Sequence, residues 1–102
     1  MGKTEFTVRL LRIAEDDLSE IIAYIAADRP KSADAMLDRI ERTLSNIAAH
    51  PHIGRIPDDD ELAALSYRFL VVDNYLIFYT IEPKTVLVHR IIHGARDYLK
   101  LL

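Results

Sequence analysis

The stretch YRFLVVDNYLIFYTIEPKTVLVHRIIH, residues 67–93, decides the fold of this chain of 102 residues. Three runs of mostly β-branched, aromatic and aliphatic residues, at 67–73, 75–82 and 85–93, are separated only by short polar turns. Because such turns join neighbouring strands into hairpins, the stretch predicts a meander of three antiparallel strands. Both faces of these strands are largely apolar. We therefore expect helices on one face of the sheet and other contacts, including the functional ones, on the second face.

The residues before the meander predict one strand followed by two helices. In residues 5–11 the apolar side chains of Phe6, Val8 and Leu10 alternate with polar ones, which is typical of a half-buried strand. From residue 14 the apolar period becomes helical, and it predicts one helix to about residue 28 and a second from Pro30 to about residue 49. The short turn between the two helices predicts an antiparallel hairpin.

The stretch HPHIGRIPDDDEL, residues 50–62, contains two prolines, a glycine and four successive acids, and predicts the one substantial loop. The expected order is therefore strand, helix, helix, strand, strand, strand. We interpret the chain as an α+β domain spanning residues 1–102, with the helical hairpin packed on a curved, mainly antiparallel sheet.

Composition narrows the classes of function. The chain contains no cysteine and carries a formal net charge of −3, and it has no apolar run long enough to span a bilayer. We therefore expect a cytoplasmic protein without a membrane partner, and nucleic acid is not the default partner of such a chain. The histidines at 50 and 52 lack carboxylate or cysteine ligands in a recognised spacing, so we expect no metal and no cofactor.

Four segments in this order resemble a known family. They are AEDDLSEIIAYIA, HPHIGR, YRFLVVDNYLIFYTI and RIIHGARD, and the likeness extends from about residue 6 to residue 97. This ordered set is similar to the RelE/ParE toxins of bacterial type II toxin-antitoxin systems. The resemblance implies a cognate antitoxin that wraps the toxin, and one of two activities. RelE-like members cleave mRNA in the ribosome, whereas ParE-like members inhibit DNA gyrase.

If this chain is a metal-independent ribonuclease, the resemblance implies catalytic roles for Arg68 and Arg96, and His93 is a candidate general acid or base because the ordinary pKa of histidine lies near neutrality. For anion or target binding it implies Arg68 and Arg96, with Tyr75 and Tyr79 on one face of their strand. Structural alternatives remain open for each of them. Arg68 could pair with Asp73 or with an acid of the first helix, Arg96 could pair with its neighbour Asp97, and the histidine and tyrosines could simply pack.

Strand alternation adds two expectations about the histidines and arginines of residues 85–93. His89 should share a face with His93, about 13 Å away along the strand, which is too far for a shared metal. Arg90 should lie on the opposite face from His93 unless the strand is bulged, so we interpret Arg90 as a structural or antitoxin-contact residue.

Two departures from the RNA-cleaving pattern favour the ParE-like activity. The four acids at 58–61 would repel phosphate beside an RNA path. The chain also lacks a basic C-terminal extension with a catalytic tyrosine, and the segments HGARD and PHIGR look more like ParE-type and plasmid-stabilisation sequences. We therefore expect inhibition of the gyrase A subunit. The ribosome with its mRNA, or a non-toxic domain that only binds antitoxin and acts as a co-repressor, are the alternatives.

The antitoxin should bind apolar surface that the fold leaves uncovered. The candidates are Tyr24 on the first helix, Arg90 at the sheet, and Tyr98, Leu99, Leu101 and Leu102 in the tail. The partner would supply an amphipathic helix, and possibly a strand added to an open edge of the first or last strand. Operator DNA would be reached only through the antitoxin, and a homodimer or a toxin-antitoxin hetero-oligomer is compatible with these expectations. Alternatively, the tail folds back on the chain's own helices.

Overall fold

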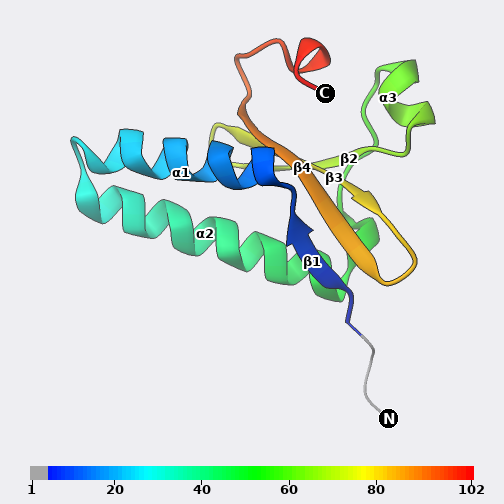
Figure 1. Ribbon diagram of the computed structural model, residues 1–102, viewed down its shortest axis with the longest axis horizontal. Helices are drawn as coiled ribbons and strands as arrows, with labels where there is room; N and C mark the ends of the chain where they lie inside the picture. Colours follow the sequence, from blue (N-terminus) through cyan, green and yellow to red (C-terminus); the bar gives the residue numbers. More distant parts are fainter. Residues whose placement is uncertain (1–4) are drawn as a thin grey trace.

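The computed structural model describes residues 5–102, in which two long helices pack on one face of an open, four-stranded mixed sheet (Figure 1). The predicted α+β class and element order are confirmed. The elements are β1 (Thr7–Leu10), α1 (Arg12–Ala26), α2 (Pro30–Ala49), the 3-10 turn η1 (Pro51–Ile53), α3 (Asp60–Ala64), β2 (Arg68–Val72), β3 (Tyr75–Ile81), β4 (Thr85–His93) and the 3-10 turn η2 (Tyr98–Lys100). No helix within this described part has the length and apolarity to cross a membrane.

The sheet has the strand order β1-β4-β3-β2. Strands β2, β3 and β4 form the predicted antiparallel meander, and β1 joins β4 in parallel with Val8 opposite Val86. The last strand is therefore central rather than an open edge, and the two edges are β1 and β2. We call the face that α1 and α2 cover the inner face of the sheet, and the opposite one the outer face.

The helices begin and end for local reasons. Pro30 occupies the first position of α2, where its missing N–H is not needed. Helix α1 begins at Arg12, two residues earlier than predicted, because the carbonyl of the extended Leu11 already accepts the N–H groups of Ala14 and Glu15. It ends at Ala26, before the sequence DRP.

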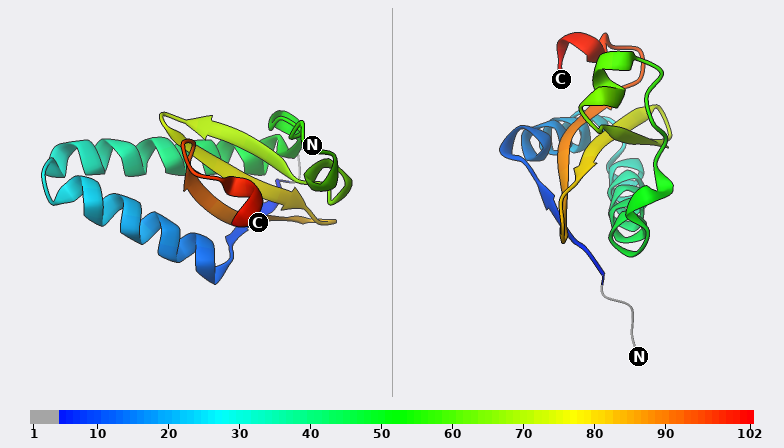
Figure 2. Two further views of the ribbon diagram at one scale, coloured as in Figure 1. Left: turned by 90° about the horizontal axis from the view of Figure 1, so that it is seen from above. Right: turned by 90° about the vertical axis from the view of Figure 1, so that its right-hand side faces the viewer.

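The inner face contains the core. Its buried side chains come from both helices and from the last three strands, and they are Ala14, Met36, Ile40, Ile47, Val72, Ile77, Tyr79, Val86, Val88 and Ile91. The predicted helical stripes pack against this cluster, because they repeat at the spacing that keeps one helix face toward the sheet. The two helices lie close at their connection and diverge toward the sheet, so the hairpin tip extends well beyond it (Figure 2).

Residues 50–62 are more ordered than predicted. They contain η1 and the start of α3, whose first turn carries Asp60 and Glu61. Asp59 caps this helix, since its side chain accepts the N–H of Leu62 at 2.9 Å. The acidic run that appeared to be loop is therefore the N-terminus of a short helix, where carboxylates are electrostatically favoured.

The outer face is covered by elements close to the C-terminus. The ring of Tyr98 in η2 lies 5.1 Å from that of Phe78, which in turn lies 5.7 Å from the ring of Phe69. The tail thus folds back on the sheet, and its last two residues, Leu101 and Leu102, line a small pocket together with Ile13 of α1. Both α3 and the tail rise from the same end of the molecule (Figures 1 and 2).

Candidate functional site

Arg68, the first residue of β2, fastens the segment around η1 to the sheet. Its Nη1 donates to the carbonyl oxygen of Gly54 at 2.9 Å and to that of His52 at 3.3 Å. The expected ion pair with Asp73 is wrong, because Asp73 accepts from Arg39 on α2 at 2.7 Å. Arg68 has no salt bridge within residues 5–102.

Tyr79 on β3 also holds the segment around η1 in place, through two hydrogen bonds of its hydroxyl group. Its hydroxyl donates to the carbonyl of Pro51 at 2.7 Å and accepts the N–H of Gly54 at 2.8 Å. Burial raises the pKa of this phenol, although the Gly54 hydrogen bond and the charge of Arg68 act to lower it. A side chain at residue 54 would collide with the Tyr79 ring, so glycine is needed there for close approach. Tyr79, predicted as a target-binding residue, is fully buried and has no surface left for a ligand.

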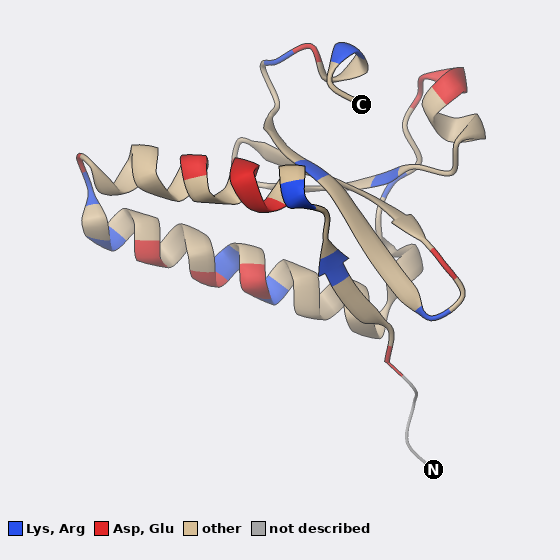
Figure 3. Cartoon of the chain, viewed as in Figure 1, with Lys and Arg blue, Asp and Glu red and all other residues tan. Residues whose placement is uncertain are grey.

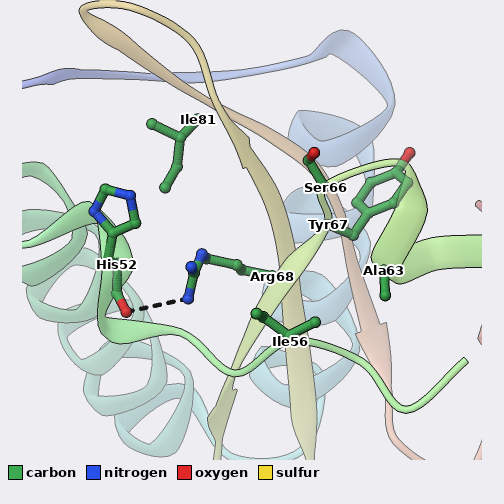
Figure 4. Close-up of a pocket in the computed structure, with 7 residues that line it drawn as sticks. All are labelled: His52, Ile56, Ala63, Ser66, Tyr67, Arg68 and Ile81. Atoms are coloured by element: carbon green, nitrogen blue, oxygen red, sulfur yellow. Dashed lines mark hydrogen bonds between the residues drawn. The ribbon is translucent and has the colours of Figure 1, made fainter. Parts of the chain in front are cut away.

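A pocket of about 280 Å³ opens beside Arg68 (Figure 4). Its lining combines a guanidinium, an imidazole and two hydroxyl groups with three apolar side chains: His52, Ile56, Ala63, Ser66, Tyr67, Arg68 and Ile81. No carboxylate lines it. Donors of this kind, with one fixed positive charge, can hold an anion such as a phosphate or a carboxylate. The arrangement provides binding but shows no paired acid and base.

His93 is the last residue of β4, and Arg96 lies in the turn that follows. The Nδ1 atom of His93 accepts the N–H of Ala95 at 3.1 Å, and its ring meets that of Tyr75 edge-on at 5.3 Å. Both His93 and Arg96 are exposed. The expected local ion pair of Arg96 is wrong, because Asp97 is paired with Lys100, at 3.9 Å.

The register of the strands places Arg68 far from His93 and from the turn that carries Arg96. Arg68 is opposite Tyr79, whereas His93 is opposite Tyr75, four residues along β3. That offset is about 13 Å along the strand, and β2 and β4 are two strand spacings, about 10 Å, apart. Arg68 and His93 therefore leave the sheet at well-separated backbone positions, and a joint role of Arg68, His93 and Arg96 on one phosphate stays a prediction.

His89 departs from strand alternation. A register shift between Phe78 and Tyr79 leaves His89 as the extra residue of β4, so it is on the outer face and not on the face of His93. Its Nε2 lies 2.9 Å from the Thr80 hydroxyl, and its Nδ1 lies 3.3 Å from the Tyr67 hydroxyl. Burial lowers the pKa of this imidazole, against the opposing effect of Glu82. The predicted shared face of His89 and His93 is wrong because the period of two is broken between them.

A cluster around Arg90 was missed by sequence reasoning. Its Nε and Nη2 donate to the two carboxylate oxygens of Asp17 at 2.8 and 2.9 Å, and its Nη1 donates to the carbonyl of Leu101 at 3.1 Å. The same carboxylate accepts the N–H of Ile91, on the part of β4 that extends beyond β1. The hydrogen bond to Asp17 raises the pKa of Arg90. Arg90 is opposite Phe78 and so lies on the outer face, away from His93, as predicted.

The predicted antitoxin contacts fall in two separate places. Tyr24 is 80% exposed near the hairpin tip, beside a hollow lined by Ile25, Ala27, Asp28 and Arg29. Tyr98, Leu101 and Leu102 are half-buried in the tail, whereas Leu99 is exposed. Figure 1 shows the hairpin tip at the far left and the tail above the sheet, well apart from each other.

No group of three or more histidine, aspartate or glutamate side chains within residues 5–102 is placed to hold a metal ion. Charge is distributed over the surface in patches of both signs. Figure 3 shows acidic residues gathered on α3 and along the first half of α1, one basic residue on β1, and basic residues between acids along α2.

Comparisons with known proteins show which family model the sequence matches and which solved structures have a similar fold. The family model described as the ParE toxin of the type II toxin-antitoxin system parDE matches residues 8–98. The fold is similar to a chain of the chromosomal ParDE toxin-antitoxin system from P. aeruginosa, with a TM-score of 0.71 and 17% identity, covering 89% of this chain and 98% of that one. It is also similar to a chain of the RelBE2 toxin-antitoxin complex from Mycobacterium tuberculosis, with a TM-score of 0.62 and 24% identity, covering 87% and 98%. Comparison with curated proteins finds no match.

Proposed function

The chain belongs to the ParE toxin family of type II toxin-antitoxin systems, and from this premise we propose that it is a single-domain toxin that inhibits bacterial growth by poisoning DNA gyrase. A cognate antitoxin neutralises it in the cytoplasm. The observation that carries the toxin assignment is the family match over residues 8–98. The choice of gyrase rests on the arrangement of the candidate residues.

What supports gyrase over mRNA as the target is the separation of the residues that cleavage would need. General acid-base cleavage of RNA requires the proton-transfer groups and the anion-stabilising groups around one phosphate. Arg68 and the turn with His93 and Arg96 lie at opposite ends of the sheet. A protein that binds and traps its target needs no such group, and the net charge of −3 is compatible with it.

In this proposal the Arg68 pocket has a binding role. The guanidinium of Arg68 donates to two backbone carbonyls, so it fixes the shape of the pocket wall and also supplies the positive charge of the pocket. A carboxylate of the target protein fits the donors that line the pocket. Tyr75 and Arg96 then belong to a separate contact at the far end of the sheet.

The antitoxin proposal rests on uncovered surface and on the names of the similar structures, which are toxin-antitoxin systems. An amphipathic antitoxin helix would lie along the hairpin, where Tyr24 is exposed. An added strand would pair with β2, whose residue Val71 is exposed at the edge beyond the bridge between Arg55 and Phe69. Operator DNA is reached only through the antitoxin, and the complex is a hetero-oligomer.

The test is inducible expression in a bacterial host, with growth, transcript integrity and supercoiling by purified gyrase followed in parallel. We expect arrested growth, blocked supercoiling and intact transcripts. Transcripts cut at codon positions with normal supercoiling would replace this proposal by a ribosome-dependent ribonuclease. Normal growth together with antitoxin binding would replace it by a non-toxic co-repressor domain.

Two variants make this test specific. Arg68→Ala should weaken gyrase inhibition, whereas Lys31→Ala, which removes an exposed cation at the start of α2, should leave it unchanged. If Arg68→Ala and Arg96→Ala each abolish transcript cutting, both residues take catalytic roles in the ribonuclease alternative. Native mass spectrometry of the co-expressed pair gives the stoichiometry.

A further inference from the structure

A groove crosses the outer face of the sheet between the segment that leads into α3 and the C-terminal tail. It encloses about 360 Å³ and is lined by Arg55, Ile56, Asp58, Phe69 and Tyr98. None of these residues lines the pocket beside Arg68 except Ile56, which lies between the two. The groove is therefore a second surface, on the other side of the 50–59 segment.

The apolar part of this groove is held in place by the fold. Phe69 is fixed by two backbone hydrogen bonds to Arg55, each 2.9 Å long, and its ring rests against that of Phe78. Phe78 is fully buried on a central strand and carries the ring of Tyr98. A partner that enters here meets a preformed aromatic surface, so little ordering entropy is lost on binding.

Exposed apolar side chains accompany the groove. Ile56 in its wall is 56% exposed, Leu99 next to Tyr98 is 52% exposed, and Leu65 at the end of α3 is 59% exposed. Ile56 and the aromatic floor form the apolar part of the groove, and exposed apolar surface of this kind is typical of a protein-binding site.

The lining of the groove carries one charge of each sign, Asp58 and Arg55, and the acidic first turn of α3 and the cation Lys100 of η2 follow nearby in the chain. Asp58 lines it, and Asp60 and Glu61 are exposed in the first turn of α3 (Figure 3). None of these three carboxylates is in an ion pair within residues 5–102. Arg55 is the single cation in the lining. The acidic side of the groove is therefore the α3 side, which disfavours a phosphate backbone and attracts lysine and arginine side chains.

We propose that this groove docks a basic segment of the toxin's protein target, with one aromatic or aliphatic side chain against Phe69 and Tyr98 and flanking cations facing Asp58, Asp60 and Glu61. The proposal rests on the proposed function in one respect, namely that the chain acts by binding a protein. Its occupant is a polypeptide and not a nucleic acid, because the charge of the groove disfavours phosphate.

The test uses the isotope-labelled full chain and three synthetic peptides, GKKFKKG, GEEFEEG and GKKGKKG, followed by NMR chemical shifts. We expect GKKFKKG to shift the backbone amides of Arg55, Phe69 and Tyr98 at millimolar concentration and low salt. The other two peptides should bind at least fivefold more weakly. Equal binding of GEEFEEG, shifts confined to the hairpin, no shifts at 5 mM GKKFKKG, or tighter binding of a ten-nucleotide thymidine oligomer would each overturn the proposal.

Matched variants test the charges. Asp60→Asn with Glu61→Gln should weaken binding of GKKFKKG about fivefold at low salt, because two facing charges are lost. Asp38→Asn with Glu41→Gln removes two exposed acids of α2 and should leave the affinity unchanged. Equal affinities in the two double variants contradict the proposal, and the amide spectrum of each confirms that it is folded.

The same variants separate this inference from the proposed function. If GKKFKKG binds the groove but the purified chain leaves gyrase supercoiling unaffected, gyrase fails as the target and the docking groove stands. If the chain inhibits gyrase equally well with and without Asp60 and Glu61, the proposed function stands and the groove is not the docking site.

Discussion

The two faces of the sheet are built differently. The inner face is a continuous apolar surface in which Ile77, Tyr79, Val86 and Val88 are fully buried under two long helices. The outer face is covered by short elements near the end of the chain, and it includes polar groups such as His89, Thr80 and Arg90. The comparison teaches that the inner face provides most of the stability and keeps only its rim, beside Arg68, open to a ligand, whereas the outer face holds the docking groove.

The largest expected difference between the faces is in stability. Ile77→Ala should destabilise the fold by about 4 kcal/mol, because it opens a cavity in the core that the helices cannot fill. Val71→Ala, on the exposed edge of the outer face, should cost less than about 0.5 kcal/mol. Urea denaturation of both variants measures this. Similar losses would contradict the assignment of stability to the inner face.

The next effect concerns the ion pair that connects α1, β4 and the tail. Arg90→Ala should destabilise the fold by about 3 kcal/mol, because it leaves the Asp17 carboxylate, only 11% exposed, without its partner. Asp17→Asn should cost a comparable amount, and the two changes together should cost clearly less than their sum. Additive losses in this double-mutant cycle would show that the pair is not a coupled unit. Arg39→Ala, in a half-exposed pair, is the matched control.

A smaller effect is expected where the inner face holds the 50–59 segment. Tyr79→Phe removes the hydroxyl from the carbonyl of Pro51 and the N–H of Gly54, and should cost about 1 to 2 kcal/mol. Tyr67→Phe, whose hydroxyl makes only a 3.3 Å contact with His89, should cost less. Hydrogen exchange at the Gly54 amide should quicken in Tyr79→Phe alone. An unchanged exchange rate of the Gly54 amide would contradict the proposal that the Tyr79 hydroxyl holds this segment.

The smallest effect is a pH dependence on the outer face. Burial lowers the pKa of His89, whose ordinary value is 6.5, so the unfolded chain binds this proton before the folded one does. Stability is therefore complete above about pH 6.5 and falls as the pH drops toward the lower folded-state value. His89→Gln should flatten this slope, whereas His50→Gln, at an exposed position, should not. Thermal denaturation between pH 7.5 and 5 measures it, and identical slopes in the native chain and His89→Gln would remove His89 as the cause.

Much of the fold could be predicted from local patterns. The alternation in residues 5–11 and the three apolar runs of 67–93 predicted all four strands, and Pro30 marked the start of α2. The helix at Asp60–Ala64 was missed, because five residues are too few for an apolar period to show. Its signal was Asp59, a capping residue three positions before the leucine whose N–H it binds.

The candidate site was less predictable. The resemblance selected Arg68, His93 and Arg96, but their distances depend on which strands are neighbours and in what register. Arg90 and Asp17 lie 73 residues apart in sequence, and neither residue type nor spacing indicates that they meet. The Phe69, Phe78 and Tyr98 stack likewise depends on where the tail returns to the sheet.

The sequence by itself determined the two long helices, the four strands and most of the core residues, because helical and strand periods are local properties. Only the tertiary structure decided the bulge at His89, the path of the tail, the separation of Arg68 from His93 and the groove beside α3. These features depend on register and on contacts between distant segments, where a shift of one residue exchanges the faces of a strand. Features that depend on local interactions could be predicted from the sequence, whereas features that depend on long-range packing could not.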